Sequence, residues 1–192
     1  MVAAQYMVGD RELGEDTLNR CRLGDPAAMR AFVKSYERAV FAFLSRALGP
    51  GHHVEDLAQE VFIRAFRAMP GFEVRGKARP STWLLTIASR VAIDHRRKRG
   101  AQAGELDAER TGAPDTPETE RRRNEIGRAL EQAAASLPDA QRDVFVLAEF
   151  HDLDQKEIAA VLGIPANTVK TRLFRARERL RELLRDVWEE GR

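Results

Sequence analysis

The stretch DQKEIAAVLGIPANTVKTRLFRAR, residues 154–177, has the pattern of two short helices joined by a tight turn. Asp154 is a good helix N-cap, and Glu157 three residues later completes a capping-box pattern. Gly163 can adopt the left-handed backbone conformation that ends the first helix. The second helix is expected to begin near Pro165. The stretch therefore predicts a helix-turn-helix.

Apolar spacing distinguishes the two faces of the second helix. Val169, Leu173, Ala176 and Leu180 form a stripe that we expect to be buried. A solvated helix with Arg for solubility is the simpler interpretation, but the cap, the small residues of the first helix and the Gly turn favour a major-groove reader. Arg can bind guanine edges, and Lys and Thr can bind phosphate. The residues that project from its other faces are Lys170, Thr171, Arg172, Arg175 and Arg179.

Helical periodicity continues through most of the remaining chain, and strand alternation is nearly absent. Asp25 and Pro26 begin one long helix, and the sequence Gly49-Pro50-Gly51 ends it. Two further apolar stripes follow before residue 99, one around Val61 and one around Leu84. Such stripes facing one another predict a helical bundle.

We expect an all-α fold of two small helical domains. An N-terminal extension covers residues 1–19, the first domain 20–99 and the second 120–188. Residues 100–119 are rich in Gly, Pro and acids and predict a flexible acidic linker.

Composition narrows the class of protein. The net charge is only +2, but the run HRRKR at residues 95–99 holds four Lys or Arg, so basic charge is concentrated locally. Cys21 is the only cysteine, and no apolar run is long enough to span a bilayer, which favours a cytoplasmic protein without membrane insertion. The four His show no metal-ligand spacing, and no phosphate loop or nucleophile motif occurs. Neither a hydrolase nor a nuclease is favoured, and no cofactor is expected.

Three motifs in order resemble one family. They are DLAQEVFIRAFR at 56–67, TWLLTIASRVAIDHRRKR at 82–99, and LPDAQRDVFVLAEFHDLDQKEIAAVLGIPANTVKTRLFRARERLR at 137–181. Together they closely resemble the extracytoplasmic-function (ECF) branch of the bacterial sigma-70 family, the promoter-recognition subunits of RNA polymerase. The resemblance implies that 20–99 is sigma region 2 and 120–188 is sigma region 4.

The resemblance also implies partners and roles. The partners are the polymerase core, through the largest-subunit coiled-coil and the flap, promoter DNA, and an anti-sigma factor. The residues with which region 4 would read the minus-35 element are Thr168, Lys170, Thr171, Arg172, Phe174 and Arg175. The residues that would bind core polymerase are Asp56, Gln59, Glu60 and Arg64. The residues that would meet the minus-10 element are Phe72, Trp83, Arg90, Asp94, Arg96 and Arg97.

Some alternatives stay open from the sequence alone. Trp83 lies on an apolar stripe and is either a core residue or a DNA contact, and Asp94 either orients a neighbouring Arg or caps the local network. The linker either threads through polymerase or is a simple tether. A promoter-specificity factor has no catalytic activity of its own, so the chain is not expected to be an enzyme. The alternative function is a helix-turn-helix regulator that binds duplex DNA without being a polymerase subunit.

Overall fold

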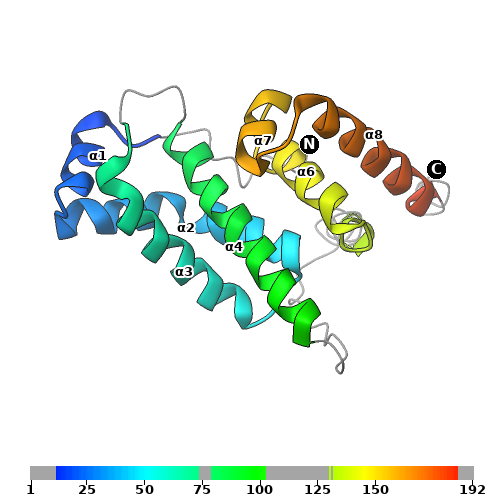
Figure 1. Ribbon diagram of the computed structural model, residues 1–192, viewed down its shortest axis with the longest axis horizontal. Coiled ribbons are helices and arrows are strands. Elements are labelled where there is room, and N and C mark those ends of the chain that lie inside the picture. The colour runs from blue at the N-terminus through cyan, green and yellow to red at the C-terminus, as the bar shows by residue number, and fades with distance from the viewer. Residues whose placement is uncertain (1–11, 74–78, 103–129, 131, 186–192) are drawn as a thin grey trace, which may run out of the picture.

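The structure, a computed structural model, describes residues 12–73, 79–102, 130 and 132–185. The first half of the chain forms a group of helices at one end of the molecule (Figure 1). Their bounds are Glu15–Arg22 for α1, Pro26–Leu48 for α2, His53–Ala68 for α3, Met69–Gly71 for the 3-10 turn η2, and Pro80–Gln102 for α4.

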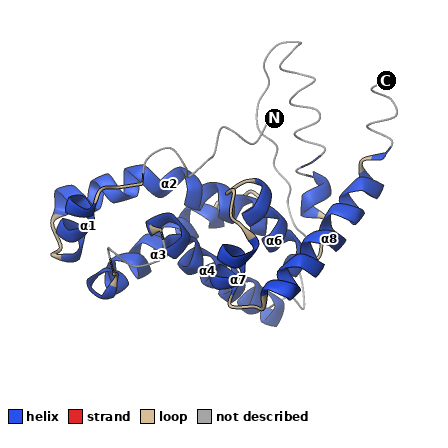
Figure 2. Cartoon of the chain, turned by 90° about the horizontal axis from the view of Figure 1, so that it is seen from above, coloured by secondary structure: helices blue, strands red, loops and turns tan. Residues whose placement is uncertain are grey.

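The second half forms the other end of the molecule. Helix α6 spans Asp139–Glu149, α7 spans Gln155–Leu162 and α8 spans Ala166–Leu183, and residues 132–135 are also helical. Within the described ranges every regular element is a helix and no strand occurs (Figure 2). The expected all-α fold is confirmed.

Local signals set the bounds of α2. The Asp25 carboxylate accepts a hydrogen bond from the backbone N–H of Ala27 at 2.8 Å, which satisfies one of the free donors at the helix start. Pro26 occupies the first turn, where its missing N–H costs nothing. Gly49 follows the last helical residue with φ of +87°, a conformation that favours glycine. The helix therefore begins and ends where the sequence predicts.

An aromatic cluster fills the core of the first half. Phe32 and Tyr36 of α2 are buried, and the Phe32 ring lies 6.4 Å from that of Phe62 in α3 and 6.5 Å from that of Trp83 in α4. The edge-on ring geometry of these pairs adds to the roughly 1.5–3 kcal/mol that burial of one such side chain contributes. The cluster joins the three long helices into one bundle.

The second half has its own packed face. The four residues of the predicted α8 stripe, Val169, Leu173, Ala176 and Leu180, are all buried. Helix α8 packs on α6 and α7, whose buried residues include Val144, Leu147 and Ile158. The spacing of apolar residues thus identified the inward face of the last helix correctly.

The two halves lie against each other. Helix α4 contacts α7, and α2 contacts α6 (Figures 1 and 2). The buried Ser89 hydroxyl in α4 has two possible acceptors. One is the carbonyl of Val161 in α7 at 3.3 Å, and the other is the carbonyl of Thr86 in its own helix at 3.0 Å. The Arg79 guanidinium, just before α4, donates to the Glu157 carboxylate in α7 at 2.7 Å. Polar and apolar contacts of the described residues therefore join the halves.

The expected domain bounds stay predictions where the structure gives no test. Helix α4 continues to Gln102, three residues past the expected end of the first domain. From residue 103 onward the expected linker lies outside the described residues. Within the expected N-terminal extension, α1 begins at Glu15, and Leu18 is buried against the first-half core.

Candidate nucleic-acid and partner interfaces

The helix-turn-helix is built by the predicted local contacts. The Asp154 carboxylate accepts from the backbone N–H groups of Lys156 at 2.7 Å and Glu157 at 2.8 Å, and the Glu157 carboxylate accepts from the Asp154 N–H at 3.0 Å. The bond from the Glu157 N–H is the main reason why the pKa of Asp154 is lowered, because it stabilises the ionised form. Gly163 has φ of +64° and turns the chain toward Pro165, the N-cap of α8.

Helix α8 carries the expected reading residues on its accessible sides. Lys170, Thr171 and Arg175 are exposed, and so is Phe174, at 65%. Thr168 and Arg172 are half-buried. A shallow hollow on this helix is lined by Asn167, Thr168, Thr171, Arg172 and Arg175.

Asn167 is a residue that the sequence reasoning missed. It lies in the first turn of α8, and its backbone carbonyl accepts from the Thr171 hydroxyl at 3.0 Å. An Asn side chain can pair with adenine in the major groove. The signal available in the sequence was its position four residues before Thr171, on the same side of the helix.

One side of α3 gathers the residues expected to bind polymerase. Asp56 and Gln59 are exposed, and Glu60 and Arg64 are half-buried. The Arg64 guanidinium donates to the Glu60 carboxylate at 2.7 Å, and this bond lowers the pKa of Glu60. Ile63 is 45% exposed on the same side and was missed. The sequence pattern that could have identified it is an apolar residue outside the buried stripe, four positions after Gln59 and three after Glu60 and so on the same side of the helix.

The α3 side continues onto α4 through an ion pair. Arg64 donates to the Asp94 carboxylate at 3.1 Å, and Arg97 donates to the same carboxylate at 3.3 Å. Asp94 therefore orients neighbouring Arg side chains, one of the two alternatives left by the sequence. Arg90 and Arg97 are exposed on α4. Positively charged side chains of α4 thus accompany the expected polymerase-binding side of α3.

The two aromatic residues expected near the minus-10 element pack on each other. The ring centroids of Phe72 and Trp83 are 4.7 Å apart. Phe72 is buried, and Trp83 is half-buried against the core cluster. Both residues help to fix the start of α4 in this structure. Their contact with DNA stays a prediction.

Comparison with known proteins decides the family. A model of "Sigma-70 region 2" matches residues 32–102, and a model of "Sigma-70, region 4" matches residues 127–180. The chain is an ECF member of the sigma-70 family. The ECF RNA polymerase sigma factor SigW of Bacillus subtilis is 36% identical over 182 residues, covering 88% of this chain and 96% of that protein. The RNA polymerase sigma-H factor of Pseudomonas aeruginosa is 30% identical over 192 residues, covering 94% and 98%.

A solved structure has a similar fold. The chain is similar to CnrH in its complex with the cytosolic domain of CnrY, with a TM-score of 0.64 and 25% identity, covering 90% of this chain and 97% of that one. The two family models and the sequence relatives confirm the resemblance seen in the sequence. The region 2 match covers α3, η2, α4 and all of α2 but its first six residues, and the region 4 match covers α6, α7 and most of α8.

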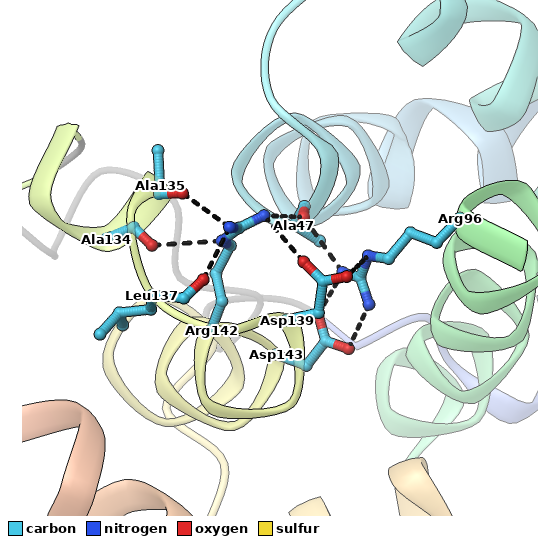
Figure 3. A network of polar contacts seen from close by, with 8 residues as sticks. All are labelled: Ala47, Arg96, Ala134, Ala135, Leu137, Asp139, Arg142 and Asp143. Carbon is cyan, nitrogen blue, oxygen red and sulfur yellow. Dashed lines mark hydrogen bonds and ion pairs between the residues drawn. The ribbon is translucent and has the colours of Figure 1, made fainter. Parts of the chain in front are cut away.

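Arg96 lies apart from the other candidate DNA residues of this sigma factor. Its guanidinium makes a two-pronged ion pair with Asp143 in α6, at 2.8 and 2.6 Å (Figure 3). It also donates to the carbonyl of Ala47 in α2 at 3.0 Å. Only 18% of the Arg96 side chain and 7% of the Asp143 side chain are exposed. The residue therefore joins region 2 to region 4 in this structure.

Arg142 crosses the same boundary from the other direction. It donates to the carbonyls of Ala135 at 2.6 Å and Leu137 at 2.7 Å inside region 4, and to that of Ala47 in region 2 at 3.0 Å (Figure 3). The Ala47 carbonyl lies in the last turn of α2, where helix carbonyls lack partners and the helix dipole is negative. The guanidinium groups of Arg96 and Arg142 thus donate to the same carbonyl at this helix end.

The N-terminal segment adds a polar contact that no motif indicated. The Glu12 carboxylate accepts from the Tyr36 hydroxyl in α2 at 2.6 Å and from the Ser81 hydroxyl in the first turn of α4. Tyr36 and Ser81 are both buried, and burial followed by the Glu12 contact raises the pKa of Tyr36. The contact spans 69 residues of sequence, so local patterns give no signal for it.

The described residues contain neither a candidate membrane span nor a candidate metal site. None of the helices there is both long and apolar enough to cross a bilayer. In the same ranges no three His, Cys, Asp or Glu side chains gather in a way that could hold a metal ion.

Proposed function

We propose that this chain directs core RNA polymerase to specific promoters and initiates transcription as an ECF sigma factor. The observation that carries the proposal is the match to regions 2 and 4 in the family's order on one chain, with a helix-turn-helix inside region 4. Members of the family are transcription initiation factors. The chain would act in the cytoplasm, with no catalytic activity or cofactor of its own.

The two regions would divide the work. The α3 side with Asp56, Gln59, Glu60 and Arg64 would dock on the coiled-coil of the polymerase largest subunit, and region 4 would lie at the flap. Support for the first docking comes from the exposure of Asp56 and Gln59 and from the adjacent apolar side chain of Ile63. A charged rim around an accessible apolar residue is a common composition for a protein interface.

DNA recognition would also be shared. Helix α8 would read the minus-35 duplex with Arg172 and Arg175 in its hollow, while α4 would meet the opened minus-10 strand. Extruding a base costs a few kcal/mol, which contacts to the exposed strand offset. The basic run that ends α4 would supply the phosphate attraction, so binding should weaken steeply with salt.

An inhibitory partner completes the proposal. The ECF resemblance implies an anti-sigma factor that covers the polymerase-binding sides. The similar structure of CnrH was solved as a complex with the cytosolic domain of CnrY, which supports a protein partner for this chain as well. Recovery of polymerase with no inhibitory partner, under every growth condition, would count against this part of the proposal.

Reconstituted transcription tests the function directly. Purified bacterial core polymerase is mixed with the full chain and a library of genomic fragments from the source organism, and the 5′ ends of the transcripts are mapped. We expect a set of starts that is absent with core alone and that shares two upstream elements. Tight duplex binding by the free chain, with no starts on any fragment, would instead favour the helix-turn-helix regulator.

A further inference from the structure

The boundary between regions 2 and 4 is closed by polar contacts along α4. They are the Arg79 pair with Glu157 near its start, the Ser89 bond to Val161 at its middle, and the Arg96 pair with Asp143 toward its end. The first and last of the three residues, Arg79 and Arg96, are 17 positions apart, which is several turns of helix, so a continuous side of α4 faces region 4. Region 4 therefore covers a side of the helix that is proposed to meet the minus-10 strand.

Both terminal nitrogens of the Arg96 guanidinium are hydrogen-bonded in this arrangement. Both terminal nitrogens donate to Asp143, one of them also donates to the Ala47 carbonyl, and Nε lies 3.6 Å from the Asp139 carboxylate. A phosphate would need the same nitrogens, because guanidinium binds phosphate and carboxylate with the same forked geometry. Arg96 can therefore pair with Asp143 or with DNA, but not with both.

Aromatic contacts between the two regions accompany the ion pair. His151, in the connection between α6 and α7, is 3% exposed, and its ring centroid lies 5.9 Å from that of Phe43 in α2. The Arg46 guanidinium of α2 lies 4.3 Å from the centroid of the Phe150 ring. Neither His151 nitrogen has a hydrogen-bond partner among the described residues. Closing the regions thus removes water from groups of both.

The other proposed interfaces remain accessible in the closed arrangement. Lys170, Thr171 and Arg175 of α8 are exposed, and so are Asp56 and Gln59 of α3. Closure therefore acts selectively. It covers the α4 side that includes Arg96 and leaves the duplex-reading helix and the polymerase-docking side open.

We propose that this sigma factor has a self-closed state in which Asp143 of region 4 occupies the place of DNA phosphate on Arg96 of region 2. The free chain would then read a minus-35 duplex but bind single-stranded DNA weakly through α4 until the regions separate. The DNA part of this proposal rests on the proposed function, whereas the closed state itself does not.

The closed state is tested by energy transfer in the full chain. Dyes are placed at Ser35→Cys in α2 and Ala160→Cys in α7, both exposed positions, with the buried Cys21 replaced by Ala. We expect high transfer efficiency for the chain alone. Asp143→Asn keeps the shape but removes the charge, and it should raise the ratio of open to closed molecules by about tenfold. Glu182→Gln is the matched control, because this exposed acid pairs with Arg179 of its own helix.

The competition is tested by DNA binding. A single-stranded oligonucleotide of random sequence should bind Asp143→Asn several-fold more tightly than the parent chain. Its affinity should fall more steeply with salt, by about 0.7 in logarithmic slope for one added phosphate contact. Adding Arg96→Ala to Asp143→Asn should remove this gain. Affinity for a mapped minus-35 duplex should stay unchanged in Asp143→Asn.

Three results would overturn the proposal. They are low transfer efficiency in the parent chain, unchanged transfer in Asp143→Asn, and a single-strand gain that survives Arg96→Ala. Failure of the proposed function would look different, since it would leave the energy transfer intact and abolish polymerase-dependent starts. The two ideas can therefore fail separately.

Discussion

The two Arg side chains that line the α8 hollow differ in exposure, and both are proposed to bind the minus-35 duplex. Arg175 is exposed, while Arg172 is half-buried, and both line the hollow. An Arg that pairs bidentately with guanine contributes about 1–3 kcal/mol of discrimination. Arg172→Ala and Arg175→Ala should each weaken binding to a mapped minus-35 duplex by about that amount, measured by fluorescence anisotropy.

Binding of Arg172→Ala and Arg175→Ala to core polymerase is the second measurement, to be compared with their binding to the duplex. It should remain at the parent value, because the proposed docking side is on α3. Arg179→Ala is a suitable control, since Arg179 lies farther along α8 and pairs with Glu182 at 3.2 Å. Loss of core binding in Arg172→Ala or Arg175→Ala would mean that α8 faces polymerase and not DNA.

Neighbouring residues in the basic run show the limit of sequence reasoning at this scale. Arg96 and Arg97 were both expected to meet DNA, yet one pairs with Asp143 in region 4 and the other with Asp94 in α4. Successive residues of a helix point about 100° apart, so a charge run always places its members on several sides. Composition predicts that such a run attracts phosphate, but the choice of side depends on packing that only the fold reveals.

Elements with local signals were predicted well from the sequence. The Asp154 capping box, the Gly163 turn and the Asp25 cap involve residues a few positions apart, and each occurs as expected. Helix α1 was missed for a physical reason. It has eight residues and only Leu18 and Cys21 are buried, so no repeating stripe could emerge. The segment before α1 is anchored by the Glu12 contact, which no local pattern encodes.

That contact leads to a prediction about the start of α4. Glu12→Ala would leave the buried hydroxyl of Ser81 without its carboxylate partner and remove the acceptor of the Tyr36 hydroxyl. An unsatisfied buried polar group costs about 1–3 kcal/mol. The free energy of unfolding of region 2 should fall by that amount. The fluorescence of Trp83 during urea titration reports it, in a chain that carries Trp188→Phe.

Two further variants separate this explanation from a general loss of charge. Glu37→Ala removes an exposed acid of α2 and should change the free energy of unfolding little. Adding Ser81→Ala to Glu12→Ala should recover part of the loss, because no orphaned hydroxyl remains at that position. A double variant that is less stable than Glu12→Ala by the full cost of a second lost bond would refute the contact as described.

The arrangement of the whole molecule lay beyond the sequence. Periodicity predicted an inward side for the helices after α1, and the family resemblance implied two regions, but neither places α6 against α2. The contacts that do so join residues far apart in the chain, such as Arg142 and Ala47. Their side chains, charged or small, have no distinctive pattern in the sequence. An acid such as Asp143 looks like any solvated helix residue until its burial is known.

Burial of His151 makes the closed arrangement sensitive to pH. Burial, and then the positive charge of Arg46 on α2, lower the pKa of His151 to about 3 in the closed state. In an open state the ring would meet water and its pKa would return to about 6.5. Between these two pKa values, His151 is therefore neutral in the closed state and protonated in the open state. Closure is fully stable well above a pH of about 6.5 and is lost progressively as the pH falls from there toward about 3.

A titration of energy transfer measures this coupling in the chain labelled at positions 35 and 160. The ratio of open to closed molecules should rise about tenfold between pH values of about 7.5 and about 5.5, a window above the usual carboxylate range. His151→Phe keeps a ring against Phe43 and should make the ratio independent of pH there. His53 and His95 stack on each other inside region 2 and remain in both chains, so they serve as an internal control. A tenfold response that persists in His151→Phe would assign the proton to another group and leave His151 as a packing residue.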